Sequence, residues 1–246
     1  MKPMDYLFVA ITALLCGASL YLMLRDVKRN GLKAPAKPEK KSAPSAPEEA
    51  VQTAAAEAPA KAVIPLSMKL YSTVMIVLTL GISVELCLLY SDNSFLFSLK
   101  RAALLCVLWP VGYIDFKTYR IPNSFVLFGL ACRVAILIPE LIFASEGLGR
   151  TLMSEGIAAG ALVLAALLCT LCMKNSVGFG DIKLFAVMGL LLGLYGIGYA
   201  MVITMLVSFV MAIVLLATKK KTRKDTIPFG PAIVIGTFLS VFLTGM

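Results

Sequence analysis

Two long apolar runs of this sequence are interrupted by Val177-Gly178-Phe179-Gly180-Asp181-Ile182-Lys183-Leu184, which brings two glycines and two charges between them. A carboxylate at the end of a membrane helix is costly to keep and marks a candidate functional site with a nearby partner. The candidate partner is Asp115, which also lies where an apolar run stops. The question is therefore whether the fold brings Asp115 and Asp181 to the same side of a bilayer.

The composition is that of a polytopic membrane protein. Apolar residues make up 59% of the chain and charged residues only 15%, whereas soluble domains hold roughly half and a quarter. The net charge of +9 comes from basic residues that flank apolar segments, as membrane topology requires, so we expect no nucleic acid partner. Histidine is absent, which excludes His-dependent zinc hydrolases and Ser-His-Asp triads.

We divide the chain into three parts. Residues 1–29 form an N-terminal anchor helix, because basic residues follow its apolar run, the opposite of a cleaved signal peptide. Residues 30–67, rich in Ala, Pro, Lys and Glu, predict a disordered cytoplasmic linker. Residues 68–246 form the membrane domain.

The fold class predicted is an all-α membrane bundle of about eight transmembrane helices. After the anchor, seven apolar segments approach the ~20 residues that span a bilayer. They are 68–90, 96–114, 124–143, 152–173, 182–196, 198–217 and 229–245, with a turn at Tyr195–Gly198 between the fifth and the sixth.

The charge distribution orients these helices. Placing most basic residues in the cytoplasm leaves Lys2, Lys100, Arg101 and Arg150 outside. This topology puts Asp115 and Asp181 together at the cytoplasmic face, although neither acid was used to choose it.

Side chains within the apolar runs give further expectations. Two glycine pairs, Gly156 with Gly160 and Gly189 with Gly193, predict close helix packing. Glu85 and Arg133 have no partner at helical spacing, so we expect them to pack or snorkel. The six cysteines lie in apolar runs and are interpreted as small buried residues, with no metal site and no disulfide framework.

Two carboxylates that share a site cannot both ionise, so one can activate water while the other holds a proton. The glycines beside Phe179 would let a substrate backbone approach. Asp115 is expected at the negative end of its helix and Asp181 at a positive end, so the proton is expected on Asp115. The alternative is that Asp181 only caps its helix, as Asp often does.

Three motifs resemble the type IV prepilin peptidases, a branch of the GxGD membrane aspartic peptidases. They are Asp115 to Pro122 followed by Asn123, Gly178 to Leu184, and Ile227-Pro228-Phe229-Gly230-Pro231-Ala232. The resemblance covers residues 68–246 in the family's order.

The resemblance implies a cofactor-free hydrolase of the bacterial plasma membrane that removes the basic leader of pilin precursors at the cytoplasmic face. Its partners would be prepilin-like precursors and membrane lipid, and its oligomeric state is left open. Asp115 and Asp181 would be catalytic. The positions that bind substrate or shape the site would be Gly178, Phe179, Gly180, Lys183, Pro122, Asn123, Pro228, Gly230 and Pro231.

One departure concerns a second activity. Bifunctional members of the family carry paired CxxC motifs after the first helix and methylate the new N-terminus, whereas residues 30–67 here contain no cysteine. We therefore expect a peptidase without N-methyltransferase activity. The rival interpretations are an ion-coupled transporter, which also needs buried acids beside broken helices, and a structural subunit of a pilus or secretion assembly.

Overall fold

The computed structural model describes residues 3–32, 65–90, 94–172, 178–218 and 228–245. Over these ranges the regular elements are all helices, joined by short connections, and no strand is formed. The helices are α1 (Pro3–Asn30), α2 (Leu66–Leu88), α3 (Phe95–Thr118), α4 (Asn123–Phe143), α5 (Leu148–Cys172), α6 (Phe179–Ala217) and α7 (Gly230–Thr244). Six are long and apolar enough to cross a membrane, and α7 is a shorter apolar helix. The all-α membrane bundle is confirmed. Most of the expected linker, residues 33–64, lies outside the described residues.

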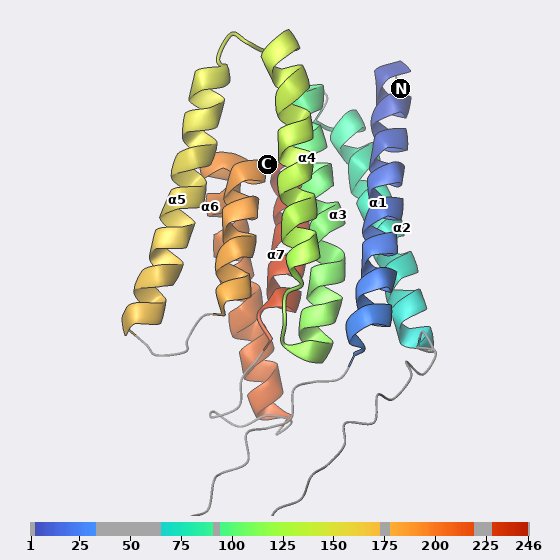
Figure 1. Ribbon diagram of the computed structural model, residues 1–246, viewed down its shortest axis with the longest axis vertical. Coiled ribbons are helices and arrows are strands. Elements are labelled where there is room, and N and C mark those ends of the chain that lie inside the picture. The colour runs from blue at the N-terminus through green and yellow to red at the C-terminus, as the bar shows by residue number, and fades with distance from the viewer. Residues whose placement is uncertain (1–2, 33–64, 91–93, 173–177, 219–227, 246) are drawn as a thin grey trace, which may run out of the picture.

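The helices stand side by side and alternate in direction along the chain (Figure 1). We call the end of the bundle where α3 ends and α4, α6 and α7 begin the aspartate end. α3 occupies the centre, and nearly every residue from Ser98 to Asp115 is buried. It contacts α1 and α2 on one side and α4, α6 and α7 on the other. The central helix therefore carries one of the two acids.

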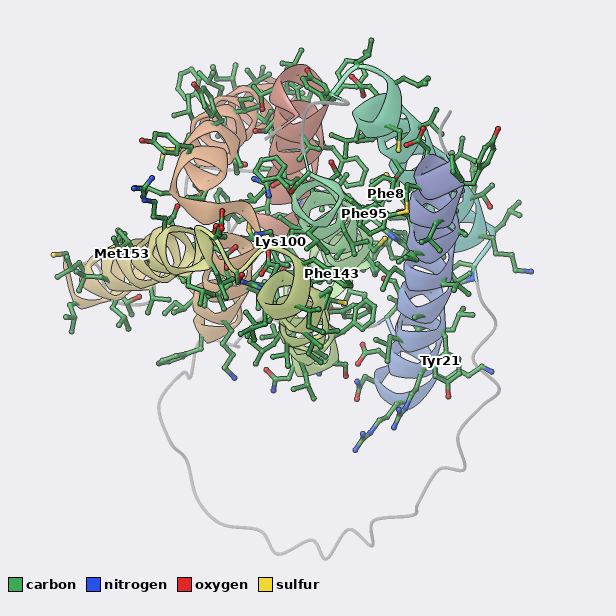
Figure 2. All side chains as sticks on the ribbon, turned by 90° about the horizontal axis from the view of Figure 1, so that it is seen from above. Phe8, Tyr21, Phe95, Lys100, Phe143 and Met153 are labelled. Atoms are coloured by element: carbon green, nitrogen blue, oxygen red, sulfur yellow. The ribbon has the colours of Figure 1, made fainter. Side chains whose placement is uncertain are left out.

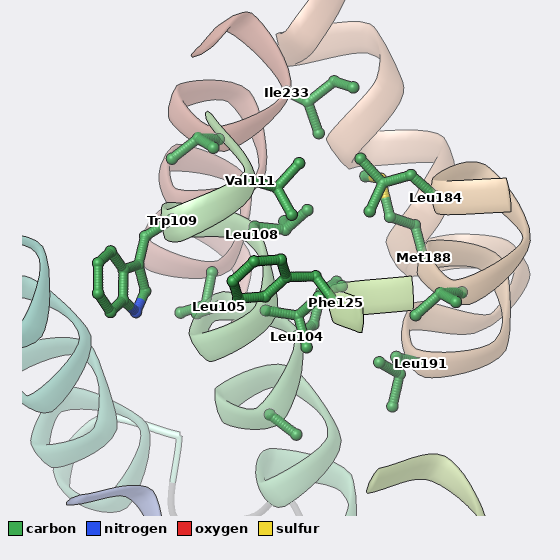
Figure 3. Close-up of a cluster of buried hydrophobic side chains, with 14 of the residues drawn as sticks. Leu104, Leu105, Leu108, Trp109, Val111, Phe125, Leu184, Met188, Leu191 and Ile233 are labelled. Carbon is green, nitrogen blue, oxygen red and sulfur yellow. The ribbon is translucent and has the colours of Figure 1, made fainter. Parts of the chain in front are cut away.

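A cluster of large apolar side chains joins α3, α4 and α6 inside the bundle, next to the aspartate end. Phe125 of α4 is fully buried among Leu104 and Leu108 of α3 (Figure 3). Leu184 and Met188 of α6, also fully buried, close the cluster from the other side. Burial of such side chains fixes the first turns of α4 and α6 against the last turns of α3.

α6 is a helical hairpin and not one straight helix. Its 39 residues would reach ~58 Å if straight, but Gly193 interrupts it with φ 69° and ψ −178°. The second half then returns beside the first (Figure 1). The two halves correspond to the segments 182–196 and 198–217 expected from the sequence. The break falls at Gly193, however, and not at Tyr195–Gly198.

One of the two expectations about glycine pairs is wrong. Gly156 and Gly160 have no heavy atom within 4 Å of the position a Cβ would take, so they do not form a packing ridge. Gly189 does, because a Cβ there would lie 2.5 Å from the backbone of Ala159.

The cysteines are also not uniformly buried. Cys16, Cys106 and Cys132 are buried, but Cys169 and Cys172 lie on the exposed face of α5. An apolar surface in contact with lipid needs no burial within the protein, which is why an apolar run did not predict their position.

Candidate active site

Asp115 occupies the last turn of α3. The backbone N–H of Tyr119 donates to the Asp115 carbonyl oxygen at 2.8 Å and ends the helix with a left-handed residue, φ 52°. The side chain points into the bundle and is only 7% exposed. A carboxylate so placed requires a polar partner inside the protein.

The partner of Asp115 comes from the beginning of α7. The backbone N–H of Gly230 donates to Asp115 Oδ2 at 2.8 Å. A Cβ at position 230 would lie 2.7 Å from that oxygen, so only glycine permits the contact. Gly230 is the first residue of α7, where unpaired N–H groups and the helix dipole favour an anion. Asp115 therefore lies at the negative end of α3 and at the positive end of α7 together.

This contact works against the sequence-based placement of the proton on Asp115. That expectation considered only the end of α3, because the sequence does not reveal that α7 begins beside it. Each helix end contributes ~0.3–2 kcal/mol, so α7 offsets the effect of α3.

Asp181 lies in the first turn of α6 and is partly exposed. Its Oδ2 accepts the backbone N–H of Gly178 at 3.3 Å, which is a long capping contact. Asp181 therefore does cap its helix, as the alternative interpretation held. Much of its carboxylate is nonetheless left for other partners, since a single long hydrogen bond is its one contact of this kind among the described residues.

Three contacts hold the beginning of α6 against the region of Asp115. Gly180 packs on Ile121, where a Cβ would lie 3.0 Å from the isoleucine Cβ. Lys183 Nζ donates to Asn123 Oδ1 at 3.1 Å. Phe185 of α6 meets Phe229, the neighbour of Gly230, edge to face at 6.1 Å between ring centroids. The structure thus brings Asp115 and Asp181 to the same end of the bundle.

The other motif residues fall into two groups. Pro122 and Pro228 are buried beside the beginnings of α4 and α7 and set where those helices start. Pro231 follows Gly230 in the first turn of α7. Phe179, in contrast, is 76% exposed.

A buried ion network near the other end of the bundle was missed by sequence reasoning. Lys100 Nζ lies 2.9 Å from Glu140 and 2.7 Å from Glu155, and Arg133 lies 2.8 Å and 2.6 Å from the same two acids. These side chains are no more than 6% exposed. Figure 2 shows Lys100 in the interior of the bundle. Arg133 is therefore paired, although no partner stands at helical spacing in its own helix.

Arg101, which the charge rule assigns to the outer side of the membrane, is also buried. It caps the first half of α6. Its Nη2 donates to the Leu192 carbonyl at 3.1 Å and its Nη1 to the Phe97 carbonyl at 3.2 Å. Leu192 directly precedes the break at Gly193, so its carbonyl is one that the interrupted helix leaves unpaired. No group of three acids and cysteines with the geometry of a metal site occurs in the described ranges.

Comparisons with known proteins point to one family. Residues 102–217 match the type IV leader peptidase family. A Bacillus subtilis (strain 168) protein named prepilin leader peptidase/N-methyltransferase is 33% identical over 131 residues, 53% of this chain and 50% of that protein. A Legionella pneumophila protein of the same name is 26% identical over 157 residues, 63% and 54% of the two chains.

This chain thus spans about half the length of these relatives. No solved structure matches it significantly. The matched region contains Asp115 and Asp181 but ends before α7, so the contact between Gly230 and Asp115 is a finding of the structure alone. The match to the type IV leader peptidase family is confined to residues 102–217, a little under half of the chain.

Proposed function

We propose that this protein is a membrane aspartic endopeptidase that removes the leader peptide from prepilin-like precursors. The observation that carries the proposal is the gathering of two carboxylates from α3 and α6 at one end of the bundle. The type IV leader peptidase family, and the names of the two relatives, support the reaction and the class of substrate.

In the proposed mechanism Asp115 and Asp181 share one proton. The ionised carboxylate removes a proton from water, and the neutral one donates a hydrogen bond to the scissile carbonyl. The N–H of Gly230 holds Asp115 in one position, and the contacts of Gly180 and Lys183 hold the first turn of α6 beside it. Apart from water and the substrate, both steps use only groups of this chain.

The site is proposed to face the cytoplasm. The aspartate end carries Arg25, Arg29, Lys117 and Arg120 among its described residues, and the positive-inside rule places such an end in the cytoplasm. The scissile bond would then lie just cytoplasmic of the precursor's apolar helix. We further propose that the protein adds no methyl group, because residues 30–67 contain none of the family's paired cysteines.

Replacement of either acid tests the proposal. Asp115→Asn, Asp181→Asn and the double variant should each lower kcat/KM for precursor cleavage by on the order of 10³ or more. The double variant should be little worse than a single one, because the pair acts as a unit. Asp26→Asn is the matched control. Asp26 lies at the same end of the bundle, but its carboxylate accepts a hydrogen bond from the Asn30 side chain of its own helix.

Mass measurement of the product reports the cleavage point and any methyl group together. Substantial cleavage by either single variant would reject the dyad and favour a structural role for the acids. The transporter would be favoured if the unmodified protein cleaved no precursor but catalysed coupled ion uptake in proteoliposomes, and if the same variants lost that uptake. A methylated product made with a methyl donor would reject the absence of that activity.

A further inference from the structure

A long apolar groove lies between α2 and α7. Its volume is about 780 Å³, and of the fourteen residues that line it only Tyr71 and Glu85 carry polar side-chain groups. Side chains on both of its walls are exposed, among them Val77 at 63% and Ile235 at 51%. The groove is therefore open to the surroundings of the bundle along the membrane span.

One end of the groove lies beside the elements that position Asp115. Pro231 lines its aspartate end and directly follows Gly230, whose N–H holds the Asp115 carboxylate. Tyr71 lines the same end and bonds the Trp109 carbonyl at 2.9 Å. The Tyr71 ring also packs on Tyr113, two residues before Asp115, with 5.0 Å between centroids. Both walls of the groove thus touch the elements that position the acid.

The dimensions of the groove suit a helix. From Tyr71 to Leu89 the wall formed by α2 rises ~27 Å, close to the ~30 Å hydrocarbon thickness that a transmembrane helix crosses. Gly81 lies midway along this wall, and a Cβ there would meet nothing within 4 Å. A glycine at such a point lets another helix approach the backbone closely.

We propose that this groove binds the apolar transmembrane helix of the precursor and delivers its cytoplasmic end to Asp115 and Asp181. The inference rests on the proposed function and names how that site selects its substrate. The bound helix would run parallel to α2 and α7, which both begin at the aspartate end, because the leader precedes the apolar helix and stays in the cytoplasm. The position of one groove end beside Gly230, whose N–H binds Asp115, distinguishes this occupant from lipid acyl chains, which could cover any apolar face.

The test fills the groove without disturbing the folded protein. Gly81→Leu and Gly81→Trp place a side chain in open space within the groove. Gly156→Leu and Gly156→Trp are the matched controls, because Gly156 is an exposed glycine of α5 that also has nothing within 4 Å. Two substrates are compared: the full precursor in detergent or vesicles, and a short peptide that contains the leader and cleavage site but lacks the apolar helix.

We expect the Gly81 variants to raise KM for the full precursor at least tenfold relative to KM for the peptide, and the Gly156 variants to change neither. Equal values for both substrates in all variants would overturn the groove while leaving the peptidase intact. Absence of cleavage of either substrate by the unmodified protein would instead reject the proposed function.

Cross-linking separates binding from cleavage. A photoreactive residue at position 77 of the Asp181→Asn variant should capture the precursor helix, whereas one at position 164, 59% exposed on α5, should not. Capture of lipid alone at position 77, with the precursor present, would overturn the proposal whether or not the protein is a peptidase.

Discussion

At the scale of single residues, the contact between Gly230 and Asp115 is the most demanding feature of the site. Asp115 is buried, and Gly230 is its one N–H donor among the described residues, so the loss of that bond would leave an unpaired polar group, at a penalty of about 1–3 kcal/mol or more. Gly178 makes the corresponding contact with Asp181, but that bond is longer, 3.3 Å against 2.8 Å. The two glycines therefore differ in what they tolerate.

Gly230→Ala should lower kcat/KM at least ~100-fold, because the added Cβ would lie 2.7 Å from Asp115 Oδ2 and 2.8 Å from its Cβ. Gly178→Ala should cost only a few fold, since its Cβ would meet the end of a side chain that can rotate, at 3.1 Å. Assays of precursor cleavage measure kcat/KM for both variants, and thermal unfolding shows that each variant is folded. The opposite order of effects would contradict the importance assigned to α7.

At the scale of elements, the sequence predicted the number and the limits of the helices well because each is an apolar run of membrane length. It placed the break in α6 incorrectly for a physical reason. Glycines at 189, 193, 196 and 198 all permit a break, and the choice is made by other helices. Arg101 donates a hydrogen bond to the Leu192 carbonyl at the end of the first half, and Ser154 Oγ accepts the N–H of Leu194 at 3.0 Å.

Gly193→Ala should destabilise the protein by on the order of 1–3 kcal/mol, because a φ of 69° with an extended ψ is strained for any residue with a Cβ. Gly198→Ala is the control: it is helical, has nothing within 4 Å and should be neutral or slightly stabilising. Thermal unfolding in detergent measures both. Equal midpoints for the two variants would show that the break can move along α6 without penalty.

At the scale of the whole molecule, the sequence predicted that both acids reach one end, because the charge rule orients all helices together. It did not predict the ion network, whose members lie on α3, α4 and α5 and are separated by up to 55 residues. A search for partners within one helix cannot find such contacts. It named Gly230 as a residue that shapes the site but not as the hydrogen-bond donor to Asp115, since only the packed bundle places α7 there.

Arg133→Met should destabilise the protein by ~3–5 kcal/mol, because it leaves two buried acids with one cation. Adding Glu155→Gln should restore part of that loss by balancing the charges. A double-mutant cycle based on unfolding free energies gives the coupling energy between Arg133 and Glu155. Cleavage per folded molecule should change little, because Asp115 and Asp181 lie at the other end of the bundle. Additive effects of the two changes would mean that the pair does not interact.

The ion network also bears on how the chain enters the membrane during synthesis. A lone Arg or Lys at the centre of a helix adds ~2.5–3.5 kcal/mol to its transfer into lipid. At the end of the bundle opposite the aspartate end, α3 and α4 together carry Lys100, Arg101 and Arg133 against Glu140 alone, and Glu155 arrives only with α5. The three helices are thus best released into the bilayer as one unit, after the translocation machinery has received the third.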